Sequence, residues 1–199
     1  MSSVAWLPLI SRCLVAIGWA GFFVFFFMRA TGRKDTSARE TKRDRSSVLG
    51  IVIQMVAISL TWMLQRHLPT AGVPLSAGEI TLDLLAPVLS LASAWIGLSA
   101  ASTLGRQWSY AARLVEGHAL VTEGPYRLVR HPIYTAMLGK LLAANFAFGH
   151  WLGLVIALPL FLVGTSIRVR SEERLLRSQF GTEYDDYAKR VPAFVPFVR

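Results

Sequence analysis

Residues with chemically useful side chains stand where the chain changes from polar to apolar sequence: Arg130, His131 and, after a proline, Tyr134. Pro132 suits the first turn of a helix, whose unpaired N–H groups and dipole favour an anion. His131 and Tyr134 are three residues apart, so they share a helix face and can add side-chain donors. The pattern predicts an anion site at this helix start. The same residues are also typical interface anchors beside a membrane, and spacing alone does not separate the two interpretations.

A second charged group begins at Arg168. Arg168 and Glu172 are four residues apart and share a helix face, and Glu173 and Arg177 have the same spacing on a neighbouring face. Such pairs are compatible with an ordinary solvated helix, but each contributes only about 0.3–0.5 kcal/mol. A gain in stability is therefore a weak explanation for the presence of these charged pairs. The functional interpretation is that Glu172 holds an ammonium group and Arg168 a carboxylate.

The segments "RQWS" (106–109) and "EGHALVTEGPY" (116–126) form one long polar connection. Gly124-Pro125 predicts a turn, and the residues from His118 to Thr122 are compatible with extended backbone. Extended backbone exposes N–H and C=O groups that a flat, adenine-bearing ligand uses. An ordinary connector would have the same pattern.

No metal-ligand set is visible, because the four histidines are scattered and the chain has one cysteine, Cys13, inside an apolar run. P-loop, G-x-G-x-x-G and G-x-S-x-G motifs are also missing from the sequence. Lys140 lies about two turns into an apolar segment, where a lone cation is costly and often functional. Its side chain can instead extend toward the membrane interface, so its role stays open.

The composition identifies the setting of these residues as a membrane. The chain has 199 residues, 53% of them hydrophobic, and a mean hydropathy of +0.45. Only 17% are charged, against about a quarter in a typical soluble domain. The apolar residues are collected in long runs. We therefore expect an integral membrane protein with a single domain.

The net charge of +9 does not indicate nucleic-acid binding. Of the 21 Lys and Arg residues, seven lie in 29–45 and seven in 168–199, and both groups flank apolar segments. Basic loops of this kind are retained in the cytoplasm beside anionic lipid, and no nucleic-acid module accompanies them. The partner they predict is the lipid bilayer.

The fold we expect is all-α, with about five transmembrane helices and a C-terminal helical hairpin, because backbone groups in lipid need internal partners. Residues 1–28 lack a basic leader and a clear cleavage site, so we interpret the first run as a span. A helix is expected to continue beyond the fifth span to Gly181, followed by another turn or two in "EYDDYAKR". The expected spans are 4–28, 48–64, 81–104, 133–148 and 152–167.

The charged loops predict the orientation. The 29–47 loop is strongly basic, whereas 69–79 has no Lys or Arg, which places the N-terminus outside and the 29–47 loop in the cytoplasm. Counting crossings puts 105–131 and the C-terminal tail on the cytoplasmic side as well. The two candidate groups then meet at one membrane face. We divide the chain into three N-terminal transmembrane helices with a basic loop (1–103) and a catalytic region with a cytoplasmic cofactor pocket (104–199).

Four pieces of the catalytic region resemble the isoprenylcysteine carboxyl methyltransferase family, within the wider group of membrane phospholipid and isoprenylcysteine methyltransferases. They span about residues 104–197 in the expected order, whereas residues 1–103 match only as transmembrane helices. One departure is Ala136, where the family often has Gly, which bears on close helix packing. The matching pieces are "LGRQWS", "HALVTEGPYRLVRHPIYTA", "RVRSEERLL" and "FGTEYDDYAKRVPAFVP".

The resemblance implies S-adenosylmethionine as cofactor, bound on the cytoplasmic side, and a lipid substrate that arrives from the bilayer. It implies that Arg168 faces the substrate carboxylate as the catalytic residue, and we expect Arg130 at the substrate as well. The residues that it implies at the cofactor are His118, Ala119, Leu120, Val121, Tyr126, His131, Pro132, Ile133, Tyr134 and Glu172.

The resemblance therefore predicts methyl transfer to a hydrophobic or lipid-modified acceptor, such as an isoprenylcysteine carboxylate. A carboxylate is already ionised near neutral pH and needs no general base, whereas an amine acceptor must lose a proton. Three alternatives stay open: an amine-lipid N-methyltransferase, a membrane NADPH-dependent reductase of the sterol-reductase type, and a non-catalytic scaffold whose motif residues are interface anchors.

Overall fold

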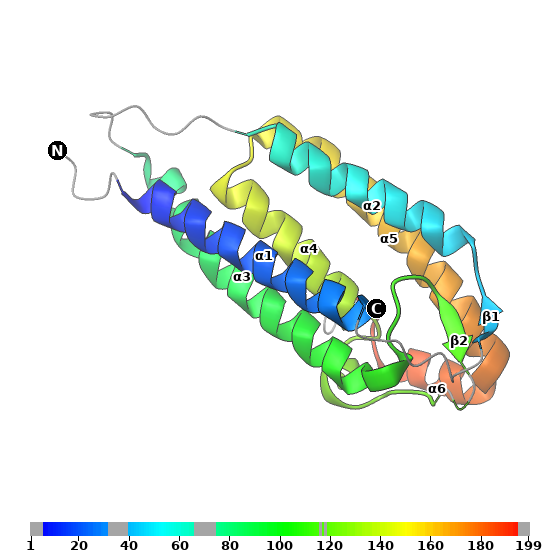
Figure 1. The fold of residues 1–199 in the computed structure, drawn as a ribbon. Coiled ribbons are helices and arrows are strands. Elements are labelled where there is room, and N and C mark those ends of the chain that lie inside the picture. The colour runs from blue at the N-terminus through cyan, green and yellow to red at the C-terminus, as the bar shows by residue number, and fades with distance from the viewer. Residues whose placement is uncertain (1–5, 32–39, 66–74, 116, 118, 195–199) are drawn as a thin grey trace.

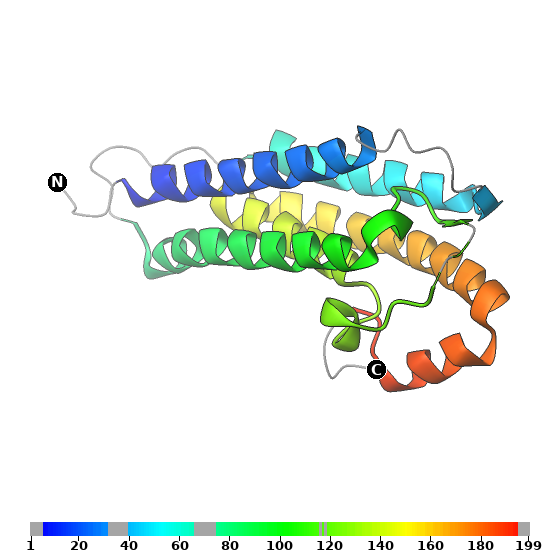
Figure 2. The ribbon, with the colours of Figure 1, turned by 60° about the horizontal axis from the view of Figure 1, so that its bottom comes forward.

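Helices dominate the computed structural model, which describes residues 6–31, 40–65, 75–115, 117 and 119–194 (Figure 1). Five of its helices are apolar and lie side by side, and a short polar helix crosses one end of the bundle (Figures 1 and 2). The expected all-α architecture is confirmed. The helices are α1 (Leu7–Thr31), α2 (Ser46–Met63), α3 (Ala77–Leu104), α4 (Pro132–Ala147), α5 (Trp151–Phe180) and α6 (Thr182–Arg190).

The helices of the bundle differ in how far they can reach across a bilayer. Among the described residues, four helices are long and apolar enough to cross a membrane: α1, α2, α3 and α5. The 16 residues of α4 extend about 24 Å, short of the roughly 30 Å hydrocarbon core. The chain is thus an integral membrane protein with four full-length candidate spans, and the expected fourth span, 133–148, is the short helix α4.

The fifth apolar helix continues well past its apolar part. At 30 residues α5 extends about 45 Å, so its C-terminal third projects beyond the hydrocarbon core. Gly181 ends it in a left-handed conformation (φ 51°) that favours glycine, and α6 follows at once. The predicted helix up to Gly181 and the predicted helical turns after it are both confirmed. Figure 2 shows α6 turning back under the end of the bundle.

Two helix pairs dominate the packing: α2 lies along α5, and α3 lies along α4 with α1 beside it (Figure 1). The small residues of α3 allow a close approach between helices. A Cβ added to Gly97 would lie 2.6 Å from the Phe22 ring and 3.1 Å from the Cβ of Ala136. Ala136 is itself buried, so the glycine that makes room here belongs to α3.

A two-stranded antiparallel sheet, which the sequence analysis did not predict, connects the long polar segment to the start of α2. Its strands are β1 (Glu40–Arg43) and β2 (Arg113–Val115), with Arg43 opposite Arg113. The sheet is extended by hydrogen bonds from Asp44 N–H to the Ala112 carbonyl and from Ala112 N–H to Ser47 Oγ, both 3.2 Å. Residues 105–115 are thereby held beside the expected site.

Candidate active site

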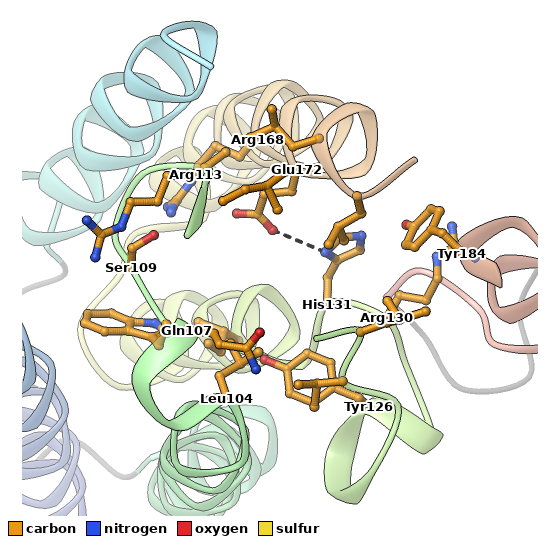
Figure 3. A pocket seen from close by; sticks show the side chains of 18 of the residues that line it. Leu104, Gln107, Ser109, Arg113, Tyr126, Arg130, His131, Arg168, Glu172 and Tyr184 are labelled. Atoms are coloured by element: carbon orange, nitrogen blue, oxygen red, sulfur yellow. Dashed lines mark ion pairs between the residues drawn. The ribbon is translucent and has the colours of Figure 1, made fainter. Parts of the chain in front are cut away.

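A pocket lies at the end of the bundle where α4 begins and α5 leaves its apolar part (Figure 3). Its walls come from four parts of the chain: the segment 104–121, residues 126–134, the second half of α5, and α6. Leu104, Ile133, Leu175 and Leu176 form apolar surface, and charged groups from α4 and α5 face one another across it. The site is therefore assembled from segments that are distant in the sequence.

Most of the residues predicted from the sequence meet at this pocket. Pro132 is buried at the first position of α4 and does not line it, and His118 lies outside the described residues. The Ala119 N–H donates to Gln107 Oε1 at 2.6 Å, so this backbone group is already bonded. The predicted residues that line the pocket are Ala119, Leu120, Val121, Tyr126, Arg130, His131, Ile133, Tyr134, Arg168 and Glu172.

His131 lies between the two neighbouring carboxylates of α5. Its Nδ1 is 3.6 Å from Glu172 Oε2, and its Nε2 is 3.2 Å from Glu173 Oε1 (Figure 3 marks the pair with Glu172). Burial opposes protonation of the ring, but the hydrogen bonds and charges of Glu172 and Glu173 outweigh it and raise the pKa of His131. Both ring nitrogens thus face a carboxylate of α5, which connects the start of α4 to that helix.

Tyr134 and Arg168 surround the other side of Glu172. The Tyr134 hydroxyl donates to Glu172 Oε1, and the Arg168 guanidinium lies over the Tyr134 ring at 4.7 Å from its centre. Arg168 donates to Gln54 Oε1 at 2.7 Å and to the Tyr110 carbonyl at 2.6 Å. Its guanidinium is therefore held by α2 and the polar segment, and not mainly by the i,i+4 carboxylate that its spacing suggested.

Arg130 also lines the pocket, but its guanidinium is engaged by the protein. It donates to Glu173 Oε1 from Nη2 at 2.9 Å, and from Nη1 to the carbonyls of Ala188 and Val191 at 2.8 and 2.6 Å. Glu173 in turn forms the predicted i,i+4 pair with Arg177, at 3.3 Å. Arg130 thus connects α4, α5 and the end of α6.

Residues 191–194, which we term the C-terminal strap, cover the start of α4. The Arg130 and His131 N–H groups donate to the carbonyls of Pro192 and Ala193 at 2.8 and 3.0 Å, and the Phe194 ring lies against His131. The N–H groups of Tyr134 and of the following threonine both donate to the His131 carbonyl. The amides expected to bind an anion here are therefore paired within the protein, and the side-chain donors of His131 and Tyr134 face the carboxylates of α5.

Several pocket residues were missed by sequence reasoning: Gln107, Ser109, Arg113, Tyr184 and Tyr187. Tyr184 and Tyr187 are three apart on the polar helix α6, a spacing that could have identified a buried face. The Tyr187 hydroxyl donates to the Tyr126 carbonyl at 2.7 Å, and burial raises the pKa of Tyr187 to about 12. These phenols therefore remain protonated donors at neutral pH.

Lys140 lies outside the pocket. Its side chain is fully buried between α1, α3 and α4, where Nζ donates to Ser90 Oγ at 2.9 Å and faces the Phe22 ring at 5.7 Å. The side chain does not extend toward the membrane interface, so that alternative is wrong. Within the described ranges, no group of three or more His, Cys, Asp or Glu is arranged to hold a metal ion.

Comparison with known proteins gives two kinds of match. Residues 82–183 match the family model described as Phospholipid methyltransferase. Over 158 residues, 77% of this chain, it is 38% identical to the cobalt-zinc-cadmium resistance protein CzcN of Cupriavidus metallidurans, of which 64% is covered. The same share of the chain is 30% identical to the nickel-cobalt-cadmium resistance protein NccN of Alcaligenes xylosoxydans xylosoxydans, 65% of which is covered.

A second kind of match is shorter. Over 98 residues, 48% of this chain, it is 33% identical to protein-S-isoprenylcysteine O-methyltransferase B of Arabidopsis thaliana, of which 50% is covered. The chain thus spans between half and two thirds of the length of these relatives. The residues matched by the family model include His131, Arg168 and Glu172, whereas Gln54, α6 beyond its first two residues, and the C-terminal strap lie outside them.

Proposed function

Because the chain belongs to the phospholipid methyltransferase family, we propose that it is a membrane enzyme that transfers a methyl group from S-adenosylmethionine to a hydrophobic acceptor. The acceptor class we propose is a carboxylate on a lipid-modified molecule, such as an isoprenylcysteine C-terminus, which the Arabidopsis relative is named for. One observation carries this choice. Arg168 and Glu172 line the same pocket at the point where α5 leaves its apolar stretch.

The donor set of the pocket fits the cofactor. S-adenosylmethionine, when bound, supplies an electrophilic methyl group on its sulfonium. Glu172 is a carboxylate for the ammonium group, and the buried Tyr184 hydroxyl, which has no hydrogen-bond partner among the described residues, can add a donor. Leu104, Ile133 and the backbone of 119–121 offer a flat apolar wall with peptide groups for an adenine. This combination of an anion, donors and apolar surface supports the assignment.

Arg168 suits the acceptor. Its Nε is buried and has no hydrogen-bond partner among the described residues, although its two Nη atoms are engaged. A fixed guanidinium orients a carboxylate by charge-assisted hydrogen bonds and excludes water from it. Because the acceptor carboxylate is already ionised, with an ordinary pKa of about 3.3–3.7, no residue has to remove a proton. The chain's task is then orientation and desolvation.

Arg130 has a different part in this proposal from the one expected from the sequence. Its contacts with Glu173 and two carbonyl groups leave it little freedom to bind substrate. We assign it to holding Glu173 beside His131, so that the neighbouring Glu172 keeps its carboxylate directed at the pocket. Replacing Arg130 should then weaken cofactor binding and stability together.

An amine acceptor is the second candidate, and the family description gives it weight. An amine must lose a proton on methylation, and the base would have to come from the pocket. His131 is not free to act as that base, because both of its ring nitrogens lie against the carboxylates of Glu172 and Glu173. The geometry therefore favours the carboxylate.

Cofactor binding is tested by calorimetric titration of detergent-purified protein with S-adenosylmethionine and, separately, with NADPH. We expect binding of the first and not of the second. Glu172→Gln should weaken S-adenosylmethionine binding by about 10- to 100-fold, the range for one charge-assisted contact. Arg174→Gln changes an exposed neighbour outside the pocket and should leave this binding unchanged. No heat of binding at millimolar S-adenosylmethionine, or binding of NADPH alone, would sink the proposal.

The acceptor class is tested with the radiolabelled methyl group. Labelled cofactor is incubated with the protein and either a farnesylcysteine analogue or a total lipid extract, and the product is treated with mild base. A methyl ester releases its label, whereas an N-methyl group retains it. We expect the farnesylcysteine product to release its label. Label that stays in the lipid fraction after treatment with base would show that the acceptor is an amine and not a carboxylate.

We also propose that the pocket faces the cytoplasm and that the N-terminus lies outside. The pocket end of the bundle carries the basic residues of α5 and α6, as cytoplasmic ends do. Single cysteines placed at exposed Lys189 and at Ala77, in a Cys13→Ser background, test the orientation. Lys189→Cys should react with an impermeant maleimide only after the cells are opened, and the reverse pattern would invert the topology.

A further inference from the structure

The orientation of Arg168 depends on a residue from the first half of the chain. Gln54 lies in the middle of α2, and its Oε1 accepts the hydrogen bond from Arg168 Nη1 at 2.7 Å. Both side chains are buried, with 1% of Gln54 and 7% of Arg168 exposed. A polar amide inside an apolar span is costly, so a specific partner is expected for it. Here that partner is the cation of the candidate site.

The amide of Gln54 is itself held in one orientation. Its Nε2 donates to Thr165 Oγ1 at 2.6 Å, and Thr165 is 3% exposed on α5, one turn before Arg168. With the amide nitrogen committed to the threonine, the amide oxygen faces the guanidinium. Thr165, Gln54 and Arg168 thus form a buried hydrogen-bonded chain between α2 and α5.

Two glycines bring the helices close enough for this chain. A Cβ on Gly50 would lie 2.5 Å from Arg168 Cγ and 2.6 Å from the Gly164 carbonyl oxygen. A Cβ on Gly164 would lie 2.8 Å from the Gly50 carbonyl oxygen and 3.0 Å from Gln54 Cγ. Real Cβ atoms do not approach other atoms this closely, so each glycine makes room for the partner helix. The contact is built around the Gln54 and Arg168 side chains.

We infer that Gln54 is a positioning residue for the acceptor: with Thr165 it fixes the Arg168 guanidinium in the orientation that receives a carboxylate. The inference rests on the proposed function. It assigns part of the specificity to α2, which lies outside residues 82–183 that match the family model. Without Gln54, Arg168 keeps its contacts with the Tyr110 carbonyl and the Tyr134 ring. It loses the hydrogen bond that fixes the plane of the guanidinium from the membrane side.

The test measures binding of a farnesylcysteine carboxylate and of its methyl ester to cofactor-free protein by calorimetry. The ester has the same lipid and lacks the charge, so the dissociation constant of the ester divided by that of the acid (the ester-to-acid ratio) reports on recognition of the carboxylate. Gln54→Leu should reduce this ratio by about 10- to 100-fold, the range for one hydrogen bond to a charged group. Thr165→Val, a milder change, should reduce it by a smaller factor, and S-adenosylmethionine binding should stay within about threefold of wild type.

Thr61→Val is the matched control. Thr61 is a buried polar residue of the same helix whose hydroxyl accepts from Asn145 Nδ2 at 3.1 Å, so its loss has a similar structural cost without reaching Arg168. This variant should keep the wild-type ratio. If Gln54→Leu and Thr165→Val keep it too, or if Thr61→Val changes it equally, the positioning role is overturned.

A double-mutant cycle completes the test. In an Arg168→Leu background, Gln54→Leu should have no further effect on the ester-to-acid ratio, because it acts through the guanidinium. Additive effects would overturn the inference. Failure of the proposed function looks different: wild-type protein would then bind no S-adenosylmethionine, or would bind acid and ester equally well, before any substitution is made.

Discussion

Replacing Glu173 by Gln is expected to destabilise the protein strongly, because one oxygen of this side chain serves three nitrogens. Glu173 Oε1 lies 2.9 and 3.3 Å from two nitrogens of Arg130 and 3.2 Å from His131 Nε2, and 8% of the residue is exposed. Removing one partner of a buried ion pair costs about 3–5 kcal/mol. Glu172 still faces His131 and the Gln amide keeps an acceptor, so we expect about 2–3 kcal/mol.

The assay is thermal unfolding of detergent-purified protein followed by circular dichroism. For a chain of this length, about 2–3 kcal/mol lowers the melting temperature by about 4–12 °C. The control is Arg177→Gln, which removes the other ion pair of Glu173 at its Oε2. Arg177 is 47% exposed, so this pair is largely screened and contributes about 0–1 kcal/mol. Equal losses in the two variants would refute the buried cluster as the source of stability.

The pH dependence of the protein's stability provides a second test of this cluster. The pKa of His131 is raised in the folded protein, so its contribution is fully present below the unfolded pKa of about 6.5 and is lost as pH rises through the folded value. Glu173→Gln removes one of the charges that raise that pKa, so the loss should be complete at a lower pH in the variant. A melting temperature of wild-type protein that does not fall as pH rises from 6.5 would contradict the protonated state of His131.

Further substitutions test other parts of the structure by the same melting assay. Gly50→Ala should cost about 1–3 kcal/mol by overpacking and weaken acceptor binding, since the added Cβ would lie 2.5 Å from Arg168 Cγ; an unchanged melting temperature would contradict the close helix contact. Lys140→Met should leave S-adenosylmethionine binding unchanged and stability equal or higher, because a buried cation with one hydrogen bond is replaced by an apolar chain; lost binding would place Lys140 in the site. Tyr187→Phe should cost about 0.5–1.5 kcal/mol through its bond to the Tyr126 carbonyl; a stabilised variant would exclude that bond.

The apolar helices were predictable because lipid leaves the backbone few choices. Each of the five runs became a helix, with the start of α4 at Pro132 and the end of α5 at Gly181 as the local signals indicate. The comparisons also confirm the resemblance to isoprenylcysteine methyltransferases that the pieces in 104–197 carried. The β1–β2 sheet was missed because its strands are short, polar and far apart in the chain, so no local periodicity marks them.

The residues that belong to the site were easier to predict from the sequence than the pairs that their side chains form. Helical spacing placed His131 with Tyr134, and topology brought them to the face that carries Glu172. The same spacing suggested that Arg168 pairs with Glu172, yet its guanidinium lies against Gln54, 114 residues away. Spacing reports only neighbours on one helix, whereas these contacts depend on how two helices cross. A polar residue inside an apolar span was the available clue to Gln54.

The C-terminal strap has a consequence for how the protein is made. Chains are synthesised from the N-terminus, so α4 is available for membrane insertion before residues 191–194 exist. Until then the N–H groups of Arg130 and His131 have no carbonyl from Pro192 and Ala193, and water must serve them. The half-built protein therefore has an open, hydrated end at the start of α4. Under the proposed function, the candidate site is complete only after residues 191–194 have left the ribosome.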